Sequence, residues 1–136
     1  MAANLTLRAM IRRVPEEHAM QLGEIIGILD GRALNEFNHA REVEYGFETA
    51  LLSDVLSQVM PDTTLIVTEI TNPQVVRTAE MVDAAGVLLV KNKMPPPETI
   101  HLATETGIPL VITRLGMFEA CGKLYAAGLR PARKAE

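Results

Sequence analysis

The sequence predicts an α/β fold in which a mostly parallel β-sheet lies between two layers of helices. Three short apolar segments predict buried strands, at residues 65–68, 86–90 and 108–113. Each is followed by a longer segment whose apolar residues recur at helical spacing. Strands that alternate with amphipathic helices are typical of βαβ units, which form parallel sheets covered on both faces. We therefore expect three layers.

Before this alternation, the sequence predicts a helix over residues 22–29. Its apolar residues share the i, i+3, i+4, i+7 spacing of one helix face, and they are Leu22, Ile25, Ile26 and Leu29. Asp30 and Gly31 are expected to end it, with Gly31 in the left-handed position that suits glycine. The preceding residues 1–19 carry a short apolar pattern broken at Pro15, which fits a strand or a helical turn equally well.

Short extended segments and a further helix are predicted between residues 32 and 62. Residues 32–35 fit a brief strand, and after a polar loop residues 43–47 fit either a short strand or a turn with Gly46 at its centre. The helix has apolar residues on one side, namely Leu51, Leu52, Val55, Leu56 and Val59. Residues 60–62 are expected to close it, because Pro61 cannot continue a helix.

The helices of the alternating region each have a recognisable start or end. Asn72 is predicted to cap the first, with Pro73 in its first turn, where the missing N–H of proline costs nothing. The proline-rich residues 94–97 precede the second helix, and Gly128 ends the third. The residues expected to be buried on these helices are Val75, Val76, Ala79 and Val82, then Ile100 and Ala103, then Phe118, Cys121, Leu124 and Tyr125.

Composition bounds the class of protein. The chain has 136 residues, enough for one domain with a substantial core, and 48% of them are hydrophobic. A net charge of −4 argues against general binding of nucleic acid or acidic membranes. The basic residues Arg130, Arg133 and Lys134 fit a solvated end better than a nucleic-acid arm.

The location is expected to be the cytoplasm. A single cysteine excludes an internal disulfide and is compatible with a reducing compartment. No apolar run approaches the roughly 18 residues that a membrane helix needs. Arginines near the N-terminus are not followed by the apolar stretch of a signal peptide.

No residue pattern predicts catalysis, a metal site or a cofactor, and no catalytic residue is assigned. The three histidines are scattered along the chain, and a zinc site usually has paired ligands a few residues apart. Cys121 is expected in the core rather than as a nucleophile. Glycine-rich phosphate loops are absent from the sequence.

One group of polar residues remains as a candidate ligand site. In open parallel sheets, ligands bind beyond the carboxyl ends of the strands, where loops and helix N-termini meet. The candidate ligand-binding residues there are Thr71, Asn72, Asn92, Lys93, Thr113 and Arg114. Their side chains suit an anionic or nucleotide-like ligand. Exposed loops are polar in every α/β protein, so simple solvation is the alternative.

Between residues 21 and 129 the chain resembles the DRTGG domain family, a small α/β module of about this size. The resemblance lies in the order and spacing of segments 22–26, 33–34, 41–47, 51–55, 72–73, 75–76, 85–87, 107–110, 118–119, 124–125 and 128–129. It divides the chain into an N-terminal extension (1–20), the domain (21–129) and a basic tail (130–136).

At the motif that names the family, this chain keeps Arg41, Val43 and Gly46 but departs at other positions. Ala40 stands where the family tends to have aspartate, and Glu44 and Tyr45 stand where threonine and the first glycine are expected. A glutamate there opposes negative ligands, which counts against an anion at this loop, whereas Gly46 still fits a tight turn. The residues carried over from the family are Arg41, Gly46, Ser53 and Asp54.

The family occurs alone or fused to regulatory nucleotide-binding modules and metabolic enzymes, and its fold is similar to the N-terminal domain of HPr kinase/phosphatase. The resemblance implies a regulatory or assembly role, dimerisation and no assignable catalytic residues. The leading hypothesis is a homodimeric regulatory module that binds a nucleotide, a phosphorylated metabolite or a partner protein. The alternatives are a dimerisation or scaffold subunit of a metabolic enzyme complex and, third, an enzyme of unknown reaction.

Overall fold

The computed structural model describes residues 19–132. The apolar pattern of residues 1–18 and the basic residues Arg133 and Lys134 lie outside this part. The elements are β1 (Met20–Gln21), α2 (Leu22–Ile28), β2 (Arg32–Ala33), β3 (Glu42–Val43), β4 (Tyr45–Glu48), α3 (Leu52–Leu56), β5 (Thr64–Thr68), α4 (Gln74–Met81), β6 (Gly86–Leu89), α5 (Pro97–Thr106), β7 (Leu110–Ile112), α6 (Met117–Ala126) and β8 (Arg130–Pro131).

The main sheet has the strand order β2-β7-β6-β5-β4-β8. Its strands from β7 to β8 run parallel, and β2 runs antiparallel to β7 at one edge. A separate small sheet pairs β1 with β3 in antiparallel fashion. Every residue of β5 and β6 is buried, which explains why these strands are nearly continuous apolar runs in the sequence. The predicted mostly parallel sheet is confirmed.

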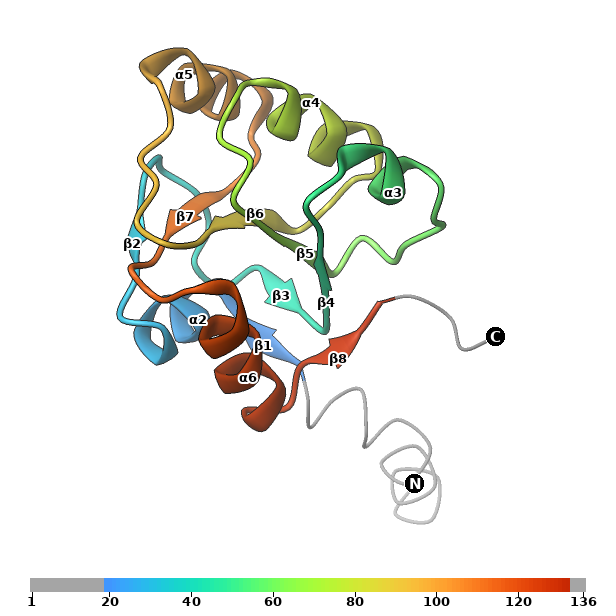
Figure 1. The fold of residues 1–136 in the computed structure, drawn as a ribbon, viewed down its shortest axis with the longest axis vertical. Coiled ribbons are helices and arrows are strands. Elements are labelled where there is room, and N and C mark those ends of the chain that lie inside the picture. The colour runs from blue at the N-terminus through green and yellow to red at the C-terminus, as the bar shows by residue number, and fades with distance from the viewer. Residues whose placement is uncertain (1–18, 133–136) are drawn as a thin grey trace, which may run out of the picture.

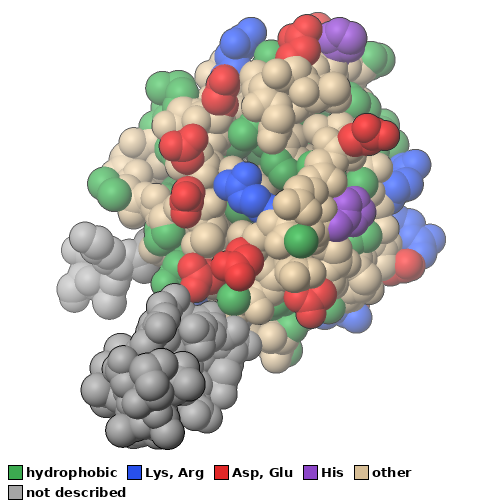
Figure 2. Space-filling view, turned by 180° about the vertical axis from the view of Figure 1, so that it is seen from behind, with side chains coloured by type: hydrophobic (Ala, Val, Ile, Leu, Met, Phe, Trp, Pro, Cys, Tyr) green, Lys and Arg blue, Asp and Glu red, His purple; other side chains and the backbone are tan. Residues whose placement is uncertain are grey.

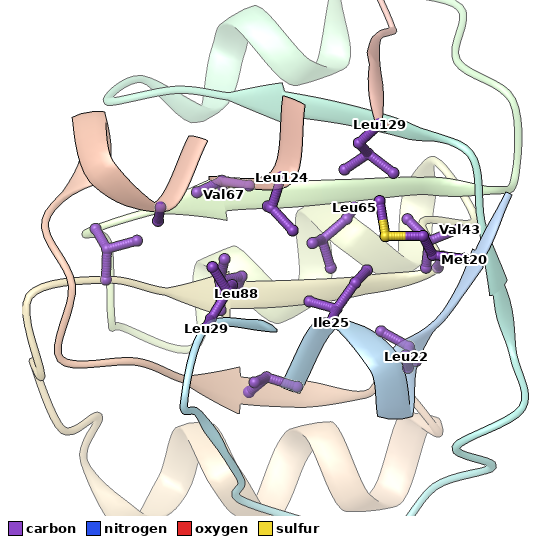
Figure 3. Close-up of a cluster of buried hydrophobic side chains, with 14 residues drawn as sticks. Met20, Leu22, Ile25, Leu29, Val43, Leu65, Val67, Leu88, Leu124 and Leu129 are labelled. Atoms are coloured by element: carbon purple, nitrogen blue, oxygen red, sulfur yellow. The ribbon is translucent and has the colours of Figure 1, made fainter. Parts of the chain in front are cut away.

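Helices cover both faces of the main sheet (Figure 1). Helices α3, α4 and α5 lie over one face, and α2 and α6 lie over the other with the small sheet. Each face therefore has its own hydrophobic cluster. Figure 3 shows the cluster on the α2 and α6 side, where Leu65 and Leu88 of the sheet meet Ile25 and Leu124 of the helices. The predicted three-layer fold is confirmed.

Several helix ends are as predicted. The Asn72 Oδ1 atom accepts a hydrogen bond of 2.9 Å from the Gln74 N–H. Pro73 has helical backbone angles, so the cap is present although α4 is assigned from the next residue. Gly128 (φ 120°), predicted to end the third helix, has positive φ after α6, where glycine costs least. Gly107 (φ 75°) ends α5 in the same way, although this end was not predicted.

The end of α2 differs from the prediction. Asp30 (φ 50°), not Gly31, has the left-handed conformation. Aspartate visits this conformation more readily than most residues because its short polar side chain can form local hydrogen bonds. Gly31 is needed for another reason, since a Cβ atom there would lie 2.9 Å from the carbonyl oxygen of Ile112. A glycine thus lets the chain pass close to β7 before it forms β2.

The prediction that α6 buries its aromatic residues is wrong. Phe118 is 93% exposed and Tyr125 is 60% exposed. The helix instead packs through Ala120 and Leu124, with Cys121 half-buried beside them. Because Ala120 is small, the axis of α6 can lie close to the sheet. With Ala120 facing the sheet, the rings of Phe118 and Tyr125 point outward.

Helix α3 is shorter than predicted, and Arg130 is part of a strand. Val55 is buried, but Leu51 is 57% and Val59 is 89% exposed. Arg130 and Pro131, expected in a solvated tail, pair with β4 as the strand β8.

Among residues 19–132, none of the helices combines the length and the apolar character that a bilayer span requires.

Candidate functional site

The carboxyl ends of β5, β6 and β7 lie at one edge of the sheet because these strands are parallel. The loops that follow hold all six predicted ligand-binding residues, which are Thr71, Asn72, Asn92, Lys93, Thr113 and Arg114. We call residues 69–72, 91–93 and 113–114 the strand-end rim. The structure thus brings the three polar connectors to one edge, while ligand binding by them stays a prediction.

A cluster of three charges lies in the strand-end rim. The Glu69 carboxylate forms ion pairs with the ammonium groups of Lys91 and Lys93, each at 3.0 Å. Hydrogen bonds from Lys91 and from Lys93 lower the pKa of Glu69 below its ordinary value, so the carboxylate stays ionised near neutral pH. Two cations against one anion leave this cluster with a net positive charge of one.

The loop that carries these lysines has an unusual backbone. Lys91 (φ 62°) and Asn92 (φ 53°) are consecutive non-glycine residues in the left-handed region. Such residues cost on the order of 1–3 kcal/mol each and are often found at functional sites. Their N–H groups donate to the carbonyls of Leu115 at 2.7 Å and Thr113 at 2.8 Å, which fixes the loop against the chain after β7.

Several polar groups of the strand-end rim already have partners within the fold. The buried Thr113 hydroxyl donates to the Leu29 carbonyl at 2.8 Å, and the Asn72 side chain caps α4. The exposed Arg114 guanidinium lies 3.3 Å from the Asp30 carboxylate. Thr113 and Asn72 therefore position the loops, and the exposed residues after β6 are better placed to meet a ligand.

A pocket of about 490 Å³ opens beside the strand-end rim, between β4, the start of α3 and the start of α6. Its lining residues are Phe47, Glu48, Thr49, Ala50, Asp54, Gln58, Glu69 and Met117. Three of them are carboxylates, so the pocket itself favours cationic or neutral groups. Glu48 and Met117 were not predicted, because only the folded chain brings β4 and α6 to this edge.

The residues carried over from the family motif do not form one site. Arg41 lies at the opposite edge of the sheet, where its guanidinium donates to the carbonyls of Asp62 at 3.1 Å and Ala84 at 3.5 Å, just before β5 and β6. Gly46 lies inside β4 and not in the predicted tight turn, and a Cβ atom there would approach Leu129 Cδ2 to 3.2 Å.

The two remaining motif residues, Ser53 and Asp54, lie on α3 at the carboxyl edge. Asp54 lines the pocket beside the rim, and its carbonyl accepts a hydrogen bond from Ser57. Arg41 and Gly46 therefore have structural roles at the start of the sheet. Asp54 is the motif residue that comes near the strand-end rim.

A second hollow of about 500 Å³, which we call the α6 groove, lies between α6 and strands β4 and β8. Its lining residues are Gly46, Glu48, Val67, Met117, Phe118, Cys121, Leu124, Tyr125, Leu129, Arg130 and Pro131. Burial, and to a lesser degree the Glu48 charge, raises the pKa of the Cys121 thiol, which makes it a poor nucleophile. Sequence reasoning missed this groove because it placed both aromatic residues in the core.

Charged side chains of both signs are interspersed on the surface, and acidic residues outnumber basic ones in the sequence. On the face drawn in Figure 2, acidic side chains are spread over the surface with basic side chains among them. Within residues 19–132, no three His, Cys, Asp or Glu side chains come together in a way that could hold a metal ion. At the carboxyl edge, Glu69 pairs with Lys91 and Lys93, and Arg114 pairs with Asp30.

Comparison with known proteins gives a match in fold. No family model matches the chain, and no curated protein matches it in sequence. The fold is similar to a crystal structure of the CBS and DRTGG domains of the regulatory region of Clostridium perfringens pyrophosphatase. That structure is a complex with an activator, diadenosine tetraphosphate.

This structural match covers 94% of the present chain and 57% of the pyrophosphatase chain, with a TM-score of 0.63 and 14% sequence identity. At this identity the match concerns the fold alone. It agrees with the α/β fold that the resemblance to the DRTGG domain family implied. The present chain spans little more than half of the pyrophosphatase regulatory region.

Proposed function

We propose that this chain is a non-catalytic regulatory module of the cytoplasm that acts as a homodimer and binds a nucleotide or another phosphorylated metabolite. The ligand contacts the loop after β6 in the strand-end rim. The observation that carries this proposal is the pairing of both Lys91 and Lys93 with the single carboxylate of Glu69. A regulatory region of similar fold binds a dinucleotide activator, which supports the class of ligand.

A phosphate group fits this arrangement on electrostatic grounds. The cluster carries an excess positive charge, and both lysines are about half exposed, so their ammonium groups can turn toward an arriving anion. Asn92, between the two lysines, adds an exposed amide that can donate hydrogen bonds. The left-handed backbone of the loop holds these side chains at the edge before a ligand arrives.

A thermal-shift experiment with diadenosine tetraphosphate, ATP and inorganic phosphate as probes tests this proposal. A ligand that binds the folded state raises the melting temperature, and the stabilisation grows with the logarithm of the ligand concentration over Kd. We expect Lys93→Ala and Arg114→Ala to reduce the shift. Arg77→Ala is the control, because it removes an exposed cation from α4 outside the strand-end rim. The absence of any shift at millimolar probe concentrations would reject a phosphorylated ligand.

A second candidate function is a dimerisation or scaffold subunit of a metabolic enzyme complex, without a small ligand. The carboxylates of Glu48 and Asp54 in the pocket beside the rim favour it, because they repel anions, whereas the Glu69 carboxylate is already paired with two lysines. Static light scattering separates the two functions when it is combined with the thermal shifts. A stable dimer that no probe stabilises supports the scaffold.

A further inference from the structure

The exposed face of α6 carries more apolar surface than its place in the fold requires. Phe118 is 93% and Tyr125 is 60% exposed, although both project from a helix that packs on the sheet through Ala120 and Leu124. Both aromatic residues also border the α6 groove, whose lining is mostly apolar. Aromatic side chains gathered beside a groove are typical of a surface that binds another protein.

Three kinds of residue form separate stripes on the outside of α6. Successive residues are turned by about 100° in an α-helix, so Phe118 and Tyr125 fall on one flank and Glu119 and Lys123 on the other. Gly122 lies between the flanks, and a Cβ atom there would meet nothing within 4 Å. A glycine at this place allows the backbone of another helix to approach closely.

We infer that a second copy of this chain binds here, with the two α6 helices antiparallel about a two-fold axis close to Gly122. This inference rests on the proposed homodimer and names the surface that forms it. A two-fold axis brings residue i against residue j and residue j against residue i. Such an axis leaves the aromatic flanks of both helices on one side and the charged flanks on the other.

The spacing of the residues fits this symmetry. Phe118 and Tyr125 lie at similar distances on either side of the helix centre, so each Phe118 meets Tyr125 of the second copy. Glu119 and Lys123 are also arranged about the centre, so opposite charges meet on the other flank. A two-fold axis along parallel helices would instead place the aromatic flank of one α6 against the charged flank of the other. The charges therefore set the orientation, whereas exposed ion pairs add little affinity.

The α6 groove provides room for the aromatic ring that crosses the interface. Its volume of about 500 Å³ exceeds that of a phenylalanine side chain, and Leu124 and Leu129 form part of its apolar lining. The Arg130 guanidinium lies 4.8 Å from the centre of the Tyr125 ring, which holds this ring at the edge of the groove. The ring of Phe118 from the second copy packs against this edge.

Sedimentation equilibrium of the full chain tests the surface. We expect Phe118→Ala to raise the dimer dissociation constant about tenfold or more, as removal of a central aromatic anchor does. Val59→Ala is the matched control, because Val59 is also highly exposed but follows α3 on the other face of the sheet. An equal effect of both substitutions, or no effect of Phe118→Ala on a dimer, overturns the inference.

Charge reversal tests the antiparallel orientation. Glu119→Lys and Lys123→Glu each place like charges together and should weaken the dimer several-fold, whereas the double variant restores opposite charges and the wild-type dissociation constant. Thermal melting of each variant confirms that the fold is intact. A double variant that dimerises no better than either single variant contradicts the antiparallel pairing.

A cross-linking experiment locates the two-fold axis. In a Cys121→Ser background, Gly122→Cys should form an intermolecular disulfide rapidly under mild copper–phenanthroline oxidation. Gly27→Cys is the control, because Gly27 is exposed on α2 with nothing near its Cβ position. Equal cross-linking of both variants overturns the inference.

The outcomes separate this inference from the proposed function. A wild-type dimer that Phe118→Ala does not weaken and that Gly122→Cys does not cross-link overturns the α6 interface but keeps the homodimer. A wild-type monomer overturns the homodimer as well, and ligand shifts then decide whether the regulatory module stands. A monomer in which Phe118→Ala makes residues 5–14 newly sensitive to protease shows instead that the N-terminal segment of the chain covers this face.

Discussion

The side chain of Asn35 binds the main chain on both sides of Pro109, at the start of β7. Its Oδ1 atom accepts a hydrogen bond from the Leu110 N–H at 3.0 Å, and its Nδ2 atom donates to the Ile108 carbonyl at 2.9 Å. The Leu34 N–H donates to the Leu110 carbonyl at 2.8 Å. An amide side chain therefore extends the antiparallel pairing of β2 and β7 beyond the last paired residue of β2.

Replacement of Asn35 by alanine should lower the free energy of unfolding by about 1–3 kcal/mol, because it leaves a buried N–H without a partner. Urea denaturation measures this change as a lower midpoint with an unchanged slope. Asn35→Asp keeps an acceptor for Leu110 but places a carboxylate oxygen against the Ile108 carbonyl oxygen, so it should also destabilise the fold. An unchanged midpoint for Asn35→Ala would show that the pairing contributes nothing.

The pKa of Glu69 should reflect its ion pairs with Lys91 and Lys93 in the strand-end rim. Because Lys91 and Lys93 lower its pKa, the pairs stabilise the fold above the ordinary glutamate pKa, and this contribution is lost as the pH falls through the lowered value. A carboxyl-carbon NMR titration should show the lowered pKa. Lys91→Ala should raise it toward the ordinary value, whereas Lys123→Ala on α6 should not move it.

Two glycines near the C-terminal end of α2 should respond in opposite ways to alanine. Gly31→Ala places a Cβ atom 2.9 Å from the Ile112 carbonyl oxygen, so we expect a loss of about 1–3 kcal/mol. Gly27→Ala meets nothing within 4 Å inside α2 and should stabilise the fold by about 0.4–1 kcal/mol. Urea denaturation of both variants measures the two signs, and equal effects would contradict this account of Gly31.

The Cys121 thiol should react slowly with iodoacetamide, with a rate that rises at higher pH than for a free cysteine. Burial comes first and the Glu48 charge second in raising its pKa. Glu48→Gln should lower this pKa and speed the reaction at a fixed pH. The unfolded thiol ionises at lower pH than the folded one, so the stability that depends on this thiol is lost as the pH rises through the folded pKa. A pH–rate profile unchanged by Glu48→Gln would exclude the electrostatic part.

The parallel centre of the sheet could be predicted from sequence because β5, β6 and β7 are covered on both faces. Strands buried in this way contain few polar residues, and the spacing of apolar residues changes clearly between these strands and the helices that separate them. The edge strands could be predicted less well. Arg130–Pro131 forms a strand only because β4 lies beside it, and a two-residue segment has no period of its own.

Side-chain partners and helix rotation could not be read from the sequence. The Thr113 hydroxyl donates a hydrogen bond to the carbonyl of Leu29, which is 84 residues away, so this bond depends on tertiary structure. The apolar residues of α6 form a stripe wider than the sheet can cover. Spacing alone does not say whether Ala120 or Phe118 lies at the centre of the contact, and the smaller residue took that place.

The strand β8 also limits how the sheet can grow. Arg130 and Ala132 direct their N–H groups to the carbonyls of Glu44 and Gly46, so the intervening residue turns its nitrogen away from β4. That residue is Pro131, which has no N–H to offer an incoming strand. An incoming strand therefore cannot extend the sheet at β8 by regular main-chain hydrogen bonds, and a neighbouring molecule must contact this edge through side chains.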